Sequence, residues 1–149
     1  MASPSPITIR KNLTNLVRHG VDAWWVEAVG KDLLRLACVR EKLPEGAEPD
    51  EEQLFEALRE LLRDAIEKLG SEQSRIILRI VLSLEPGTLE LSLRERREKA
   101  GLEFRRGRQT VTWGTIRSYH ERRAIDQLAK MIFGMEQSAS TPPLFDDGT

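Results

Sequence analysis

The sequence predicts an all-α protein, a compact bundle of about six helices, from its composition and its hydrophobic spacing. Charged residues make up 32% of the 149 residues, and aromatic residues only 5%. This balance is typical of helical proteins rich in Leu, Glu and Arg, and it disfavours a β-sandwich, whose strands are enriched in aromatic and β-branched residues. Apolar residues, 40% of the chain, are numerous enough for one folded core.

The N-terminal part of the chain predicts two helices after a short arm. Residues 1–6 are small, polar and rich in proline, and are expected to form a disordered arm. Apolar residues at helical spacing then begin at Ile7, and Gly20 interrupts or ends this pattern. A second pattern predicts a helix over residues 26–39, and two prolines and a glycine predict a loop over residues 42–50.

The clearest helix is predicted over residues 51–69. Asp50 is a suitable N-cap, and Gly70 is a suitable residue to follow the last turn. Its apolar residues form one wide stripe at helical spacing: Leu54, Leu58, Leu61, Leu62, Ala65, Ile66 and Leu69.

Residues 71–84 are predicted to form a helix that is buried on most sides. Its many β-branched residues also fit a buried strand, but Arg75, Arg79 and Ser83 are spaced by four, which favours the helix. The Glu85-Pro86-Gly87 sequence then predicts a turn.

The C-terminal part predicts two more helices and a tail. Ser92 and Glu95 fit a capping box for a helix over residues 93–100 that Gly101 closes. Thr112 or Thr115 is expected to cap a last helix that runs to about Phe133 and ends at Gly134. Residues 137–149 are expected to form a disordered tail. The expected apolar face of the last helix is Ile116, Tyr119, Ala124, Ile125, Leu128, Ala129 and Ile132.

The strongest indication of function is the distribution of charge. Residues 91–133 contain eleven Lys and Arg against five Asp and Glu, a net charge of +6, although the whole chain has a net charge of −1. A basic segment in a near-neutral chain suggests a polyanionic partner, and DNA is the first candidate because phosphate contacts supply most non-specific affinity. We therefore expect residues 7–90 to form a helical core with a dimer or partner surface, and residues 91–136 to form the binding segment.

Two helices joined by a basic connection fit a helix-turn-helix module, in which the second helix begins in the major groove. Here the start of the second helix, with His120 and Glu121, is expected to be exposed. Arg117 suits a guanine edge or a phosphate, and the hydroxyl groups suit phosphate oxygens. The predicted DNA-contacting residues are Arg105, Arg106, Arg108, Thr112, Thr115, Arg117, Ser118, Arg122 and Arg123.

The sequence of residues 114–124, GTIRSYHERRA, resembles the recognition helix of bacterial sigma-factor-like and related helix-turn-helix domains. The resemblance implies that Thr115, Arg117 and Ser118 face DNA and that Ile116 anchors the helix in the core. The usual connection between the two helices has about three or four residues, whereas residues 101–111 make eleven. This length indicates either a winged or modified variant, with the loop acting as a basic arm, or a chance likeness.

An alternative function is that of a protein-interaction adaptor or an oligomerising module. Residues 51–90 contain nine acidic against five basic residues, so the basic segment can instead dock on this acidic segment or on an acidic partner protein. Mixed Arg and Glu runs such as residues 94–99 are also common on solvated helices. In the pair Trp24-Trp25, at least one tryptophan is expected to lie in the core.

The sequence argues against an enzyme. Its two histidines, His19 and His120, lie far apart, and it has no metalloprotease, nucleophile-elbow or phosphate-loop motif. Cys38 is the single cysteine, so neither an internal disulfide nor a cysteine-based zinc site can form. We therefore expect no cofactor, and no signal peptide or membrane span is evident, so a cytoplasmic protein without a membrane partner is the default.

Overall fold

All secondary structure in the described part of the chain is helical. The computed structural model describes residues 4–44, 48–103 and 112–140, and within these ranges it confirms the all-α prediction. The elements are α1 (Pro6–His19), α2 (Ala23–Val29), the 3₁₀ turn η1 (Lys31–Arg35), α3 (Ala37–Arg40), α4 (Glu51–Glu67), α5 (Glu72–Val81), α6 (Leu93–Glu103), α7 (Trp113–Thr115), the π-helical turn η2 (Ile116–His120) and α8 (Glu121–Ser140).

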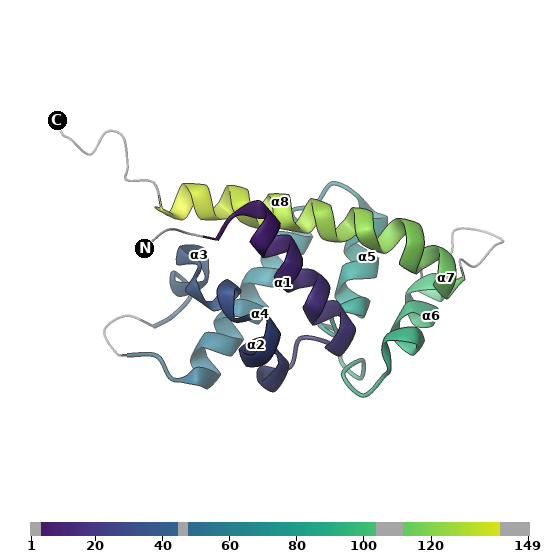
Figure 1. Ribbon diagram of the computed structural model, residues 1–149, viewed down its shortest axis with the longest axis horizontal. Coiled ribbons are helices and arrows are strands. Elements are labelled where there is room, and N and C mark those ends of the chain that lie inside the picture. Colours follow the sequence, from purple (N-terminus) through teal and green to yellow (C-terminus); the bar gives the residue numbers. More distant parts are fainter. Residues whose placement is uncertain (1–3, 45–47, 104–111, 141–149) are drawn as a thin grey trace.

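The long helix α8 organises the bundle. It runs along the length of the molecule and lies across α1, α3 and α5 (Figure 1). One continuous hydrophobic core fills the space between these helices and α4. Its buried side chains come from both halves of the sequence. Within the described residues, no helix combines the length and the apolar content that a bilayer crossing requires.

The predictions for α4 and α5 are confirmed. Asp50 and Gln53 form a reciprocal capping box at the start of α4, and Ser71 accepts the N–H of Ser74 at the start of α5. Most of the predicted stripe of α4 is fully buried, and each such Leu or Ile contributes about 1.5–3 kcal/mol through burial. Residues 72–81 form a helix and not a strand.

The prediction of one helix over residues 26–39 is wrong. The chain forms α2, η1 and α3 instead, with breaks at Gly30 and at the extended residue Leu36. A Cβ atom at position 30 would lie 3.0 Å from a methyl group of Leu16, so glycine permits the close approach of this segment to α1. At the second break, the carboxylate of Glu136 accepts the N–H groups of Ala37 and Cys38, each at 3.0 Å. The buried carboxylate of α8 therefore caps α3.

Two glycines that the sequence predicts as helix ends lie inside helices. Gly101 is buried within α6, and α8 continues past Gly134 to Ser140. Glycine costs a helix interior only about 0.5–1 kcal/mol relative to alanine, and beyond Gly134 the carboxylate of Glu136 joins α8 to α3 through two hydrogen bonds. Residues 137–140, predicted as part of the tail, are therefore helical, and residues 141–149 lie outside the described residues.

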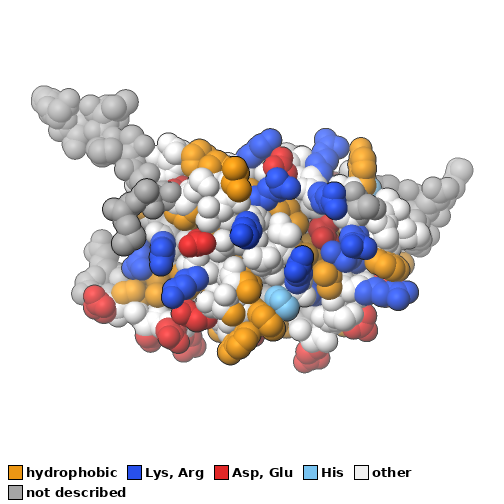
Figure 2. Space-filling model, viewed as in Figure 1, with side chains coloured by type: hydrophobic (Ala, Val, Ile, Leu, Met, Phe, Trp, Pro, Cys, Tyr) orange, Lys and Arg blue, Asp and Glu red, His pale blue; other side chains and the backbone are white. Residues whose placement is uncertain are grey.

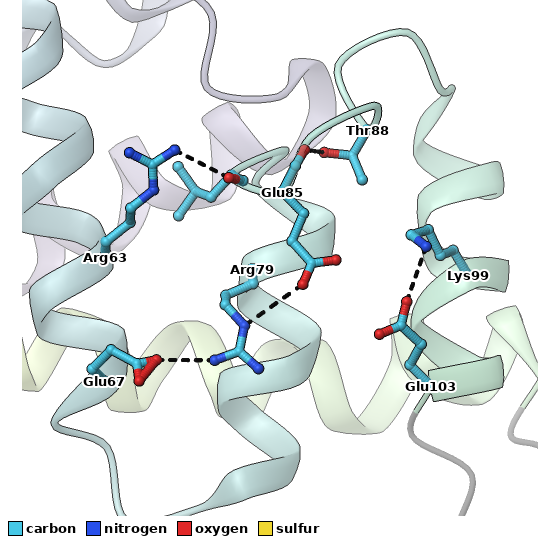
Figure 3. Close-up of polar contacts among 8 residues, drawn as sticks. Arg63, Glu67, Arg79, Glu85, Thr88, Lys99 and Glu103 are labelled. Atoms are coloured by element: carbon cyan, nitrogen blue, oxygen red, sulfur yellow. Dashed lines mark hydrogen bonds and ion pairs between the residues drawn. The ribbon is translucent and has the colours of Figure 1, made fainter.

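Local ion pairs neutralise part of the acidic segment. Arg79 on α5 contacts Glu67 on α4 and Glu85 in the following loop, at 3.0 and 3.8 Å (Figure 3). Glu60 and Asp64 on α4 pair with Lys42, which precedes α4 in the chain. These pairs hold α4 against its sequence neighbours.

Candidate nucleic-acid interface

The basic segment forms two packed helical stretches. Ser92 and Glu95 make the predicted capping box at the start of α6, with bonds of 2.9 and 3.1 Å. The second stretch runs without a break through α7, η2 and α8. Of the two predicted caps, Thr112 is the one that acts, because its hydroxyl oxygen accepts the N–H of Thr115 at 3.3 Å.

The π-helical turn η2 changes which residues of this stretch face inward. The N–H of Glu121 donates to the carbonyl of Ile116, five residues earlier. Ile116 and Glu121 are both buried, and the buried positions then continue at ordinary helical spacing through Ala124 and Leu128. The turn therefore inserts one extra residue into the helix, as π-turns do, and such turns are frequent at functional sites.

Two sequence predictions fail at this turn. Tyr119, expected on the apolar face, is 62% exposed, and Glu121, expected on the exposed start, is only 6% exposed. Both errors have the same cause. The prediction assumes a constant α-helical period, whereas the extra residue in the turn shifts the inward-facing positions by one residue.

The buried carboxylate of Glu121 pairs with Arg97 of α6. The Nε and Nη2 atoms of Arg97 each donate to one carboxylate oxygen at 2.8 Å, and the two side chains are 13% and 8% exposed. This bidentate geometry fixes the orientation of both side chains. It joins α6 to the first turn of α8.

Arg96, the preceding residue, fixes the position of α1. Its guanidinium donates to the carbonyl of Val17 at 2.9 Å, to that of Arg18 at 3.2 Å, and to that of Val81. The side chain is 2% exposed, and burial lowers the pKa of Arg96 to about 10, with the charge of Arg97 adding to this effect. Because these carbonyls lie at the ends of α1 and α5, a cation is favoured there by both helix dipoles.

A cleft of about 680 Å³ opens between α1, α6 and α8. Five arginines and one glutamate are among the described residues that line it. The arginines of α1, η2 and α8 that line it are exposed, whereas Arg97 and Glu121 are held by their mutual ion pair. The lining residues are Arg10, Thr14, Val17, Arg18, Leu93, Arg97, Arg117, Glu121, Arg122 and Ile125.

The π-helical turn also explains why two of the predicted residues line this cleft together. Residues five apart in an α-helix point about 140° away from each other around the axis. Arg117 and Arg122 are five apart, but the turn between them adds a residue and brings both onto the cleft.

The remaining predicted residues are distributed as follows. Thr112, Thr115 and Arg123 are exposed but are not among the residues that line the cleft. Ser118 lies in η2, and its side chain is not among those described. The three loop arginines, Arg105, Arg106 and Arg108, lie outside the described residues.

Sequence reasoning missed the half of the cleft that α1 supplies. Arg10, Thr14 and Arg18 lie more than seventy residues before the basic segment, which begins at residue 91, and join it only through folding. A signal was present, because α1 contains no acidic residue and has Arg18 and His19 in its last turn. The acidic residues that follow α1 outnumber its basic residues, so the net charge of the N-terminal part of the chain does not reveal them.

Other polar and aromatic groups near the interface have local roles. Arg94 lies over the ring of Trp113, 4.9 Å from its centroid, which connects α6 to α7. Burial and the charge of Arg123 lower the pKa of His120. This shift favours the neutral form of the imidazole.

The expectation that one residue of the Trp24-Trp25 pair is in the core is wrong. Trp24 is 66% exposed, and Trp25 is half-buried and stacked on His19 with ring centroids 3.5 Å apart. In the short helix α2, only Val26 is buried. Trp25 is covered by the last residue of α1 and not by the core.

The described residues contain no group of three or more His, Cys, Asp or Glu side chains arranged to hold a metal ion. Burial, followed by the nearby carboxylate of Glu136, raises the pKa of Cys38 to about 12, so its thiol is protonated and unreactive at neutral pH. Comparisons with known protein families, curated proteins and solved structures find no match to this chain.

Proposed function

We propose that this protein binds DNA through the basic face of α1 and the start of α8, and that it acts as a non-enzymatic regulator. The observation that carries this proposal is the convergence of Arg117 and Arg122 with Arg10 and Arg18 around one cleft. Arginine forks suit phosphate oxygens, and several of them on one face supply the electrostatic term that dominates DNA affinity.

The distribution of charge over the surface supports this assignment. Lys and Arg side chains are numerous over α1 and α8 and extend toward α3, whereas most acidic side chains lie along the lower margin of the same view (Figure 2). The acidic residues Glu60, Asp64, Glu67 and Glu85 have local partners in Lys42 and Arg79. Glu121 is directed to Arg97.

The exposed hydroxyl groups of Thr112 and Thr115, at the first turn of α7, extend the basic face toward the helix start. Hydroxyl groups and backbone N–H groups at a helix start commonly contact DNA phosphates and position a helix on the duplex. In this proposal the start of the α7–α8 stretch approaches the duplex, and α1 follows the neighbouring backbone.

The experiment is fluorescence anisotropy with a labelled random duplex over a salt series. We expect the wild type to bind and the affinity to fall steeply with salt. The double variant Arg117→Ala/Arg122→Ala should bind more weakly, with a slope of log affinity against log salt that is shallower by about 1 for each lost phosphate contact.

The matched control is Arg35→Ala/Arg40→Ala, which removes two exposed arginines that do not line the cleft. Its affinity and salt slope should stay near those of the wild type. Absence of binding at low salt, or equal losses in both double variants, would count against this function.

A further inference from the structure

The cleft between α1, α6 and α8 has the size and charge of a discrete ligand site. Its volume of about 680 Å³ lies within the range of roughly 300–1,000 Å³ that small-molecule sites occupy. Five arginines and one glutamate among its described lining residues give a net charge of +4. A single phosphate carries too little charge to balance this cleft.

The donors in the cleft come almost entirely from arginine. The hydroxyl of Thr14 already donates to the carbonyl of Arg10 at 2.9 Å, so it offers a ligand only its lone pairs. Arg97 uses its Nε–H and one Nη2–H on Glu121. A guanidinium has five N–H groups, so three of them make no bond to another described residue. Glu121 thereby holds Arg97 in place as a preorganised donor.

The base of the cleft is apolar. Val17 and Ile125 are 1% and 4% exposed, and Leu93 is half-buried beside them. A phosphate chain over an apolar base would be partly shielded from water, which strengthens its interaction with the arginines.

We propose that this cleft binds a ligand with two or three adjacent phosphates, and that Arg10, Arg18, Arg97, Arg117 and Arg122 contact them. The ligand is either a free polyphosphate or successive phosphates of a nucleic-acid backbone. The site shares Arg10, Arg18, Arg117 and Arg122 with the proposed function and adds Arg97. Tripolyphosphate binding can be measured without DNA, so the two proposals are tested separately.

The test is isothermal titration calorimetry of the full chain with inorganic tripolyphosphate and, separately, with inorganic phosphate. We expect tripolyphosphate to bind at one site and at least tenfold more tightly than phosphate. The variant Arg10→Ala/Arg18→Ala should lose at least tenfold in tripolyphosphate affinity. Both side chains are exposed, so this variant should keep the wild-type unfolding midpoint, and Arg35→Ala/Arg40→Ala should bind like the wild type.

Equal losses in the two double variants, or no binding of tripolyphosphate by the wild type, would overturn the proposal.

A competition experiment with a labelled duplex identifies the source of the phosphates. If tripolyphosphate displaces DNA, the cleft takes the backbone, and if it binds without displacing DNA, the ligand is a free polyphosphate. Binding of tripolyphosphate by a protein with no DNA affinity would support the cleft and reject the DNA function. DNA binding by a protein that does not bind tripolyphosphate would do the reverse.

Discussion

Arg96 is a residue whose burial could not be predicted from the sequence. It lies in the run of residues 94–99, where alternating Arg and Glu predict a solvated helix face, yet it is 2% exposed. Backbone carbonyls at the ends of α1 and α5 accept hydrogen bonds from its guanidinium, and these bonds allow the side chain to be buried. These acceptors are supplied by distant parts of the chain, so hydrophobic periodicity within α6 cannot reveal them.

We expect Arg96→Met to destabilise the protein by about 2–4 kcal/mol, since each buried carbonyl that loses its partner costs about 1–3 kcal/mol and the removal of a buried charge offsets part of the loss. Methionine keeps much of the aliphatic volume, so the effect reports mainly the lost hydrogen bonds. Urea denaturation followed by circular dichroism measures it.

The control for this prediction is Arg40→Met, at an exposed position, which should change the free energy of unfolding by no more than about 0.5 kcal/mol. If both variants unfold at the wild-type midpoint, Arg96 does not hold α1 and α5 to α6.

The arginines that line the cleft differ in how far the sequence reveals them. Arg117 and Arg122 could be proposed from local charge, and both line the cleft. Their common orientation could not be deduced, because an unbroken α-helix would separate them. Arg10 and Arg18 could not be assigned to the site at all, since only the packing of α1 on α8 brings them there.

Helices with clear caps and a clear apolar stripe were predictable as elements. The capping boxes at Asp50 and Ser92, and the cap at Ser71, are local interactions within four residues, and the structure contains all three. The breaks at Gly30 and Leu36 depend instead on Leu16 of α1 and Glu136 of α8. Such long-range contacts cannot be deduced from the hydrophobic pattern of the segment itself.

The π-helical turn η2 provides a prediction about the register of α8. Deletion of Tyr119, which is 62% exposed, leaves Ile116 and Glu121 four residues apart, which matches the ordinary helical repeat. We therefore expect the deletion variant to fold with wild-type helical content and an unfolding midpoint near that of the wild type. Circular dichroism with thermal unfolding measures both quantities.

Deletion of the exposed Lys130 is the matched control, because it removes one residue from a regular part of α8. It rotates the residues after it by about 100°, which takes Ile132 and Glu136 from their buried positions and should cost about 2–5 kcal/mol. Equal destabilisation by the two deletions would show that η2 does not carry an extra residue.

At the scale of the whole molecule, the basic face is assembled from both ends of the chain. The charge count over residues 91–133 identified one half of it. The other half is α1, which crosses α8 (Figure 1). Arg10 and Arg18 of α1 line the same cleft as Arg117 and Arg122. Linear charge patterns therefore underestimate a surface whenever the fold joins distant segments.

The alternative function, a module whose basic segment docks on an acidic surface, makes a different prediction for the whole molecule. In that case two copies should associate at low salt, when the basic face of one meets residues 51–90 of another, and should separate at high salt. The local ion pairs made by Lys42 and Arg79 reduce the charge that this acidic segment offers to a second copy. We therefore expect gel filtration to give the same elution volume at about 50 mM and 500 mM salt, a range over which exposed charge interactions change strongly. A larger species that appears only at low salt, and that is lost in Arg117→Ala/Arg122→Ala but kept in Arg35→Ala/Arg40→Ala, would instead assign the basic face to protein association.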